Sequence, residues 1–178
     1  MNIAKQLRNK NIAEYLLYMW QTEDILRANH CDIDQLRKNV IAQFPASEQP
    51  ELERWYDDLA NMMRAEGTTE HGHLQINRNV ILELDELHAR LLSSTKFPFY
   101  NAAYFKALPF IVELRHKNGG KEENELETCF EALYGLLLLR LQKKTVSPET
   151  ATALNSISKF IAMLAAYYEQ DRQGELEL

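Results

Sequence analysis

Apolar side chains recur at intervals of three or four residues along almost the whole chain, and this spacing is typical of helices that bury one face. Near the start, Ile12, Leu16, Met19 and Leu26 form one such stripe. No stretch alternates apolar and polar residues for long enough to indicate a half-buried strand. The pattern predicts an all-α fold, with helices within residues 3–28, 32–44, 47–67, 77–94, 98–117, 122–144 and 148–168.

Residues that commonly begin or end helices support these boundaries. Asp32 followed by Gln35 has the spacing of a capping box, which predicts a helix start. Ser147 before Pro148 is typical of a first helical turn. Gly67 suits the left-handed conformation that ends many helices.

The connections between the segments are short, and no low-complexity linker separates two parts of the chain. A chain of 178 residues can bury a single core without help from metals or disulfides. The sequence therefore predicts one domain over residues 1–178, a bundle of six to seven mostly antiparallel helices. The helix over 98–117 is expected to be kinked or broken at Pro109, which removes a backbone hydrogen bond. Residues 68–77 give no clear assignment.

The chain carries 20 Lys and Arg against 26 Asp and Glu, and its formal net charge is −6. Ten acidic and three basic side chains fall within residues 48–86, which indicates a solvated acidic face. Such a chain lacks the basic surface that binding to nucleic-acid phosphates needs. A DNA-binding regulator with a helix-turn-helix at residues 13–28 and 32–44 is the least favoured alternative, since Asp32 and Asp34 would open its recognition helix.

Several features together favour a cytoplasmic protein without membrane segments. Cys31 and Cys129 lack C-x-x-C spacing, so they indicate neither a zinc site nor a redox motif and fit a reducing compartment. The first ten residues lack the apolar core of a signal peptide. The longest apolar run, residues 160–168, has nine residues where a bilayer crossing needs about 20.

Two stretches carry a resemblance to a known family. They are NIAEYLLYMWQTEDILRA near the start and SSTKFPFYNAAYFKALPFIVELR in the centre. Both resemble an uncharacterised domain-of-unknown-function family of Bacteroides and its relatives, and the resemblance covers the whole chain. It implies an all-helical bundle in a bacterial cytoplasm. It supplies no catalytic or binding residues, so the function has to be argued from this chain alone.

Two pairs have the spacing of a metal centre in a helical bundle. Enzymes of the ferritin type use Glu-x-x-His pairs that project into the bundle. Glu113 and His116 have this spacing, but they lie away from the apolar stripe of their helix. Asp85 and His88 are a looser match, and a histidine beside an apolar stripe is more often a hydrogen-bonded packing residue. A metal-dependent helical-bundle enzyme is therefore the second choice.

Glu70, His71 and His73 offer three further ligands within four residues, but short spacing alone is weak evidence, and a polar surface loop is the simpler interpretation. The sequence has no nucleophile elbow, P-loop or dinucleotide fingerprint. We therefore predict no catalytic residues, no metal and no cofactor.

Glu23 lies on the apolar stripe of its helix, four residues after Met19, and should be at least partly buried. A buried carboxylate needs a partner or takes up a proton. Arg140 is the candidate partner, because it interrupts an otherwise apolar run in the sixth predicted helix. The hypothesis is a buried Glu23–Arg140 ion pair; the alternative places both residues separately at the rim of the bundle.

Residues 97–110 contain six aromatic side chains, an unusual density. One interpretation is that they fill the space at one end of the bundle beside the two prolines of this segment. The other is that part of the segment stays exposed and binds a protein partner or a small apolar ligand. The candidate residues for this surface are Phe97, Phe99, Tyr100, Tyr104, Phe105 and Lys106.

Together these features favour a non-enzymatic cytoplasmic module that binds another protein or a small apolar ligand, with no role for nucleic acid or membranes. A homodimer is a further hypothesis. It rests on the large apolar side chains Trp55, Tyr56, Met62 and Met63, which accompany the acidic residues of the third predicted helix.

Overall fold

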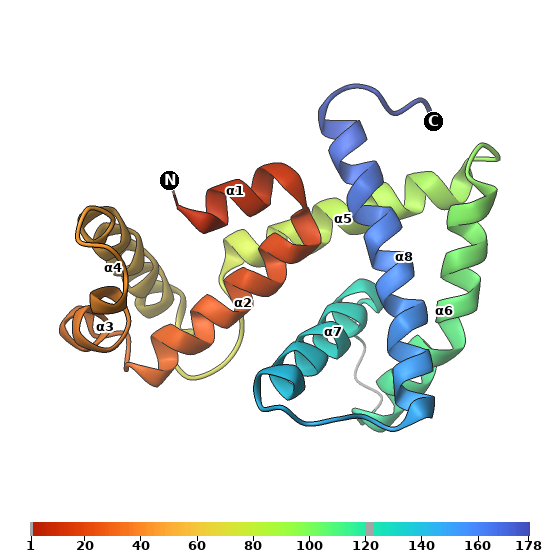
Figure 1. Ribbon diagram of the computed structural model, residues 1–178. Coiled ribbons are helices and arrows are strands. Elements are labelled where there is room, and N and C mark those ends of the chain that lie inside the picture. Colours follow the sequence, from red (N-terminus) through yellow and green to blue (C-terminus); the bar gives the residue numbers. More distant parts are fainter. Residues whose placement is uncertain (1, 120–122) are drawn as a thin grey trace. The chain divides into compact units, whose positions relative to one another are not determined.

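The computed structural model describes residues 2–119 and 123–178, and these fold into helices without a strand (Figure 1). The all-α class is therefore confirmed, although the described residues form eight α-helices and one 3-10 helix rather than six to seven helices. The elements are α1 (Ile3–Lys10), α2 (Ile12–Ala28), α3 (Ile33–Asn39), η1 (Ile41–Gln43), α4 (Gln49–Glu66), α5 (Gln75–Ser93), α6 (Pro98–Lys117), α7 (Glu125–Leu141) and α8 (Pro148–Arg172).

The extra helix arises because the first predicted segment divides at Asn11. The Oδ1 atom of Asn11 accepts a hydrogen bond from the Ala13 backbone N–H at 3.0 Å, which caps the start of α2. Asn2 caps α1 in the same way through the Ala4 N–H. The apolar pattern continues across the break, so periodicity alone could not show it.

Three of the expected helix ends are confirmed. Asp32 begins α3, although its side chain accepts from the Asp34 N–H rather than completing a box with Gln35. Gly67 ends α4 with a φ of 70°, the left-handed conformation that glycine tolerates. Ser147 begins α8 and accepts from the Thr150 N–H.

Pro109 does not break its helix. The helix α6 is continuous from Pro98 to Lys117 with the proline inside it, and its axis bends along its length (Figure 1). Two of the residues at the predicted junction that follows, Gly120 and Glu122, lie outside the described residues.

The chain divides into two compact units, so the single-domain bundle is not confirmed. The first unit comprises Met1–Lys10 and Glu14–Val80, and the second comprises Asn11–Ala13 and Ile81–Leu178. The helix α5 contributes its first residues to one unit and the remainder to the other.

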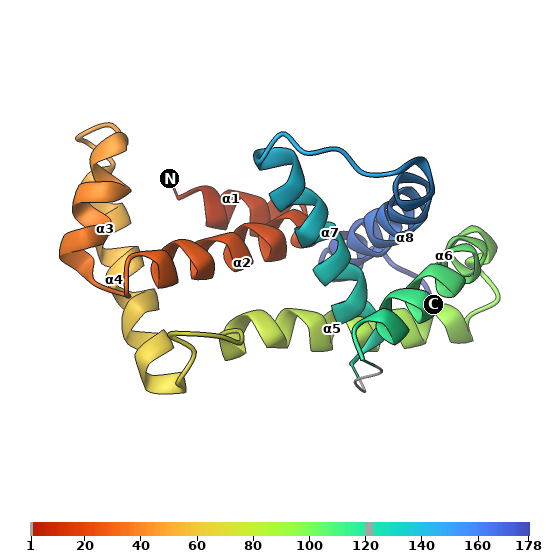
Figure 2. The same ribbon diagram turned by 90° about the horizontal axis from the view of Figure 1, so that it is seen from below.

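In the first unit, α3 packs against η1 and α4 (Figure 2). Its core includes Leu26, Leu36 and Ile41, which are fully buried. On α4, Tyr56 and Met63 are buried while Trp55 and Met62 are half-buried. Two of the four large apolar side chains on which the homodimer hypothesis rests therefore lie in this core, and the other two remain partly exposed.

In the second unit, α8 lies against α6 and α7, and α6 also contacts α7 (Figure 1). Aromatic rings fill the centre, where Tyr100 of α6, Phe130 of α7 and Phe160 of α8 are fully buried. Among the described residues, none of the helices combines the length and apolar character needed to span a membrane.

Candidate functional site

The first unusual feature is the carboxylate of Glu23, which is 0% exposed on α2. Its Oε1 atom accepts hydrogen bonds from the Leu74 backbone N–H at 3.0 Å and from Asn77 Nδ2 at 2.6 Å. Its Oε2 atom lies 2.7 Å from His73 Nδ1 and 3.9 Å from Arg27 Nη2. The buried charge therefore has partners from the segment that leads into α5 and from its own helix.

The side chain of Arg27, one turn after Glu23, binds backbone carbonyl groups of the same segment. Its Nε donates to the Thr68 carbonyl oxygen at 3.2 Å, and its Nη2 donates to the Gly72 carbonyl oxygen. Its Nη1 donates to the side chain of Asp24 at 2.9 Å. One face of α2 thus holds residues 68–77, the stretch that had no clear assignment from the sequence.

His73 is fixed on two sides. Its ring stacks on the buried Trp20 ring, with centroids 4.2 Å apart and planes 12° apart, and its Nδ1 faces Glu23. Its side chain is 25% exposed. Among the residues that the structure describes, no three His, Cys, Asp or Glu side chains gather closely enough to hold a metal ion. The arrangement fastens the connection between α4 and α5 to α2.

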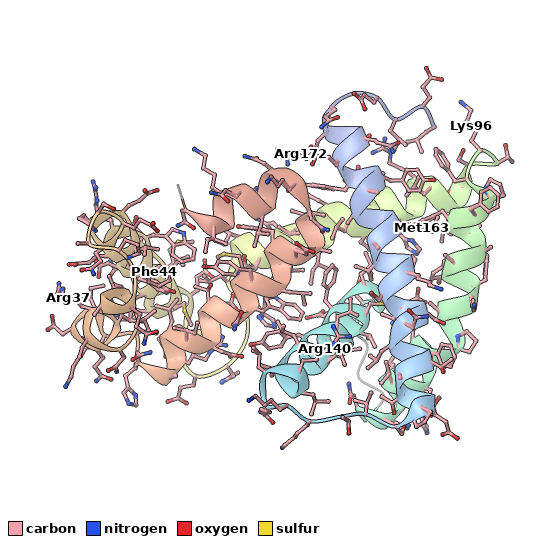
Figure 3. All side chains as sticks on the ribbon, viewed as in Figure 1. Arg37, Phe44, Lys96, Arg140, Met163 and Arg172 are labelled. Atoms are coloured by element: carbon pink, nitrogen blue, oxygen red, sulfur yellow. The ribbon has the colours of Figure 1, made fainter. Side chains whose placement is uncertain are left out.

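The predicted partner of Glu23 has a different environment. Arg140 lies in the last turn of α7 in the second unit and is exposed (Figure 3). The expectation of a buried arginine is therefore wrong, because only Glu23 of the predicted pair is buried. The burial of Glu23 itself is confirmed, and His73, Leu74 and Asn77 supply its hydrogen bonds.

The second feature is the buried histidine of the second unit. His88 Nδ1 lies 2.5 Å from the Tyr100 hydroxyl, and the rings of Tyr104 and Phe160 meet the imidazole edge to face, at 4.7 and 5.4 Å. Burial lowers the pKa of His88 and outweighs the opposite influence of the acidic Glu125. The neutral imidazole is therefore a hydrogen-bonded packing residue, as its place in the sequence indicated.

The same core holds other polar groups that it keeps uncharged. The Tyr104 hydroxyl donates to Glu125 Oε2 at 2.5 Å, and burial raises the pKa of Tyr104. Burial also raises the pKa of the Cys129 thiol. A thiol that stays protonated is a poor nucleophile.

The third feature is the outward face of α6. Some of the residues predicted to form an aromatic surface face the core, and others lie on this outward face. Tyr100 and Tyr104 point into the core, and Phe97 is half-buried with its ring centroid 5.1 Å from that of Tyr167. Phe99 and Phe105 are instead 81% and 60% exposed. The structure thus brings three of the candidates inward, against other helices.

The exposed candidates belong to a longer apolar row. Val112 is 55% exposed, and the positions between it and Phe99 continue the same face at intervals of three or four residues. We call this row the α6 outer stripe; its members are Phe99, Ala102, Phe105, Pro109 and Val112. Large exposed apolar groups in one row are informative, whereas single ones are common on protein surfaces.

Charged side chains lie along one border of the outer stripe, between Ala102 and Phe99 around the helix. Lys106 and Glu113 are exposed and lie seven residues apart, about two helical turns. Lys117 Nζ lies 2.9 Å from Glu113 Oε1, and both side chains are largely exposed. An exposed pair of this kind adds little stability, so these charges are available to other partners.

Sequence reasoning missed His73 and Asn77 as partners of Glu23, and it missed the continuation of the stripe to Pro109 and Val112. The regular spacing of apolar positions along α6 could have indicated the longer stripe. No pattern in the sequence links Glu23 on α2 to partners fifty positions later.

Both units are built from helices, so the described part of the chain is all-helical. The chain belongs to the family described as "Domain of unknown function (DUF4924)", whose family model matches residues 1–175. Comparisons with curated proteins and with solved structures found no match.

Proposed function

We propose that this protein is a non-enzymatic protein-interaction module and that the α6 outer stripe is its contact surface. The observation that carries the proposal is the exposure of Phe99, Phe105 and Val112 on one face of one helix. Burying a Phe or Val side chain against a partner is worth about 1.5–3 kcal/mol. Three such side chains in a row supply a driving force for association.

The opposite face of the same helix explains why the stripe is not needed for folding. Tyr100, Tyr104, Ala107 and Ile111 are buried and attach α6 to its own unit. The stripe residues alternate with these along the helix and make the outer surface. The helix is thus held rigidly from one side and presents apolar groups on the other, as a preorganised contact surface should.

The shape and charge of the stripe indicate what kind of partner fits. Apolar positions spaced by three and four residues match the grooves of another helix. The neighbouring Lys106 and Glu113 carry opposite charges, so a matching helix would carry opposite charges at the corresponding places. The partner is therefore an apolar helical face with charged residues along one border.

A photo-cross-linking residue can test this surface in cells. We expect p-benzoylphenylalanine in place of Phe105 to give a discrete adduct, whereas the same residue in place of the exposed Lys159 on α8 gives none. The adduct should disappear when Phe99→Ser is added. The Phe99→Ser variant should keep its free energy of unfolding within about 0.5 kcal/mol, because the side chain is exposed.

The alternative outcomes separate a contact surface from a structural one. Equal cross-linking at positions 105 and 159, or none at either, would overturn the proposal. So would a large loss of stability in the Phe99→Ser variant. For comparison, Tyr104→Ala removes a buried aromatic group and should cost about 3–5 kcal/mol.

A further inference from the structure

We infer that the partner of the α6 outer stripe is a second copy of this chain, docked with the two α6 helices antiparallel about a two-fold axis. This inference rests on the proposed function and names its partner. It follows from the order of residues along the stripe, which is complementary to itself when one copy is reversed. Two-fold symmetry requires this kind of self-complementary patch.

The apolar residues of the stripe satisfy the symmetry in two registers, the first of which pairs Phe99 with Val112 and Ala102 with Pro109. In the second register, Phe105 of one copy faces Pro109 of the other and Ala102 faces Val112, because the residue numbers of both pairs have the same sum. Each contact occurs twice. The smallest member of the stripe, Ala102, then lies opposite a branched side chain rather than opposite itself, which helps two helices to pack closely.

The charges beside the stripe favour the second register. In it, Lys106 of one copy and Glu113 of the other are offset by about 7.5 Å along the axis, at 1.5 Å per residue, whereas the first register offsets them by about 12 Å. Helical side chains tilt toward the N-terminus of their own helix, so in an antiparallel pair these two lean toward each other. Two ion pairs between the copies result.

Phe99, the most exposed large residue of the stripe, also gains a partner. Phe99 and Lys117 are eighteen residues apart, which is five helical turns, so they lie on the same border of α6. In this antiparallel register, Lys117 of the second copy and Phe99 are offset by only about 3 Å along the helix axis. Its aliphatic stem can cover the ring, and its ammonium group can approach the ring face.

A parallel pairing fits less well. In a parallel two-fold dimer, the border that carries Lys106 and Glu113 would face the opposite border of the second helix, where Phe105 and Val112 lie. The charges would then contact apolar side chains, and the opposite charges would not meet. The position of the charges therefore favours the antiparallel arrangement.

The expected dimer is weak. The helix α6 has 20 residues and is about 30 Å long, so one face of it buries less than the roughly 800 Å² per partner of a standard interface. Association in about the 1–100 µM range is typical of such a contact. The full chain should therefore change from monomer to dimer over accessible concentrations.

Sedimentation equilibrium of the full chain with charge variants tests the inference. We expect Lys106→Glu and Glu113→Lys each to weaken the dimer, because each places like charges together twice. An equimolar mixture of the two variants restores both opposite pairs and should associate about tenfold more tightly than either alone. The double variant in one chain should also recover.

Further variants separate this inference from the proposed function. Phe105→Glu should make the chain monomeric at an unchanged melting temperature. Leu82→Glu, a control at an exposed apolar residue of the second unit outside the stripe, should leave the dimer intact. A chain that stays monomeric at about 1 mM, or a mixture no tighter than its components, overturns the second copy as partner. A cross-link from position 105 to a different protein would then leave the proposed function standing.

Discussion

Glu23 gives the sharpest stability prediction, because its carboxylate is fully buried and has three hydrogen-bond donors. Glu23→Ala removes the acceptor and leaves the Leu74 N–H and the Asn77 amide without a partner in a buried place. Each unsatisfied buried donor costs about 1–3 kcal/mol. The Glu23→Ala variant should therefore lose about 3–5 kcal/mol of unfolding free energy, a large part of the total for a small protein.

The near-isosteric Glu23→Gln variant separates charge from hydrogen bonding. Its amide oxygen can still accept from Leu74 and Asn77, so we expect a smaller loss of about 1–2 kcal/mol. Glu51→Ala, at an exposed residue of α4, is the control and should stay within about 0.5 kcal/mol of the parent.

Urea unfolding followed by tryptophan fluorescence measures these losses at the site. In a Trp55→Phe background, Trp20 is the one remaining tryptophan, and its ring stacks on His73 beside the carboxylate. Far-ultraviolet circular dichroism should report the same order of stability. A Glu23→Ala variant within about 1 kcal/mol of its parent would refute the reasoning, because the substitution leaves the buried Leu74 N–H and Asn77 amide without an acceptor.

Two further predictions concern the other polar clusters. Because burial lowers the pKa of His88, the unfolded chain binds a proton more readily than the folded one; the resulting stability is present above about pH 6.5 and is lost as the pH falls below it. The unfolding free energy should therefore decrease as the pH is lowered from 7 to 5, and it should decrease less steeply in the His88→Gln variant. An equal slope in the parent and the variant would contradict the role of His88. Arg27→Lys keeps the charge but loses the fork that binds Thr68 and Gly72. Hydrogen exchange in residues 68–74 should become at least about tenfold faster, corresponding to about 1.4 kcal/mol, while unchanged protection would contradict the role of Arg27.

Helix content was predictable from the sequence because apolar spacing depends on local geometry. The caps at Asp32 and Ser147 act within three residues, and both predictions are confirmed. The break at Asn11 was missed because apolar periodicity continues through it, while the cap depends on one side chain. The division of the chain into two units was missed because α5 is continuous across it.

The site was predictable only in part, and the reason is the distance along the chain. That Glu23 is buried follows from its place on a stripe, whereas its partners lie about fifty residues away and depend on how the α4–α5 connection folds. Likewise, aromatic density located the α6 segment. Which aromatic residues face the core depends on the packing of α6 against α8, and that packing places Tyr104 inward and Phe105 outward.

The central claim, that α6 binds α6 of a second copy in antiparallel orientation, is tested most directly by a distance between copies. A spin label at the exposed residue 116, introduced as His116→Cys, suits double electron–electron resonance because Cys31 and Cys129 are buried. At concentrations above the dissociation constant, the proposed register separates the two labels by about 27 Å along the axis. A distance below about 15 Å, as a parallel pair would give, or no coupling between copies at about 1 mM, would contradict the account.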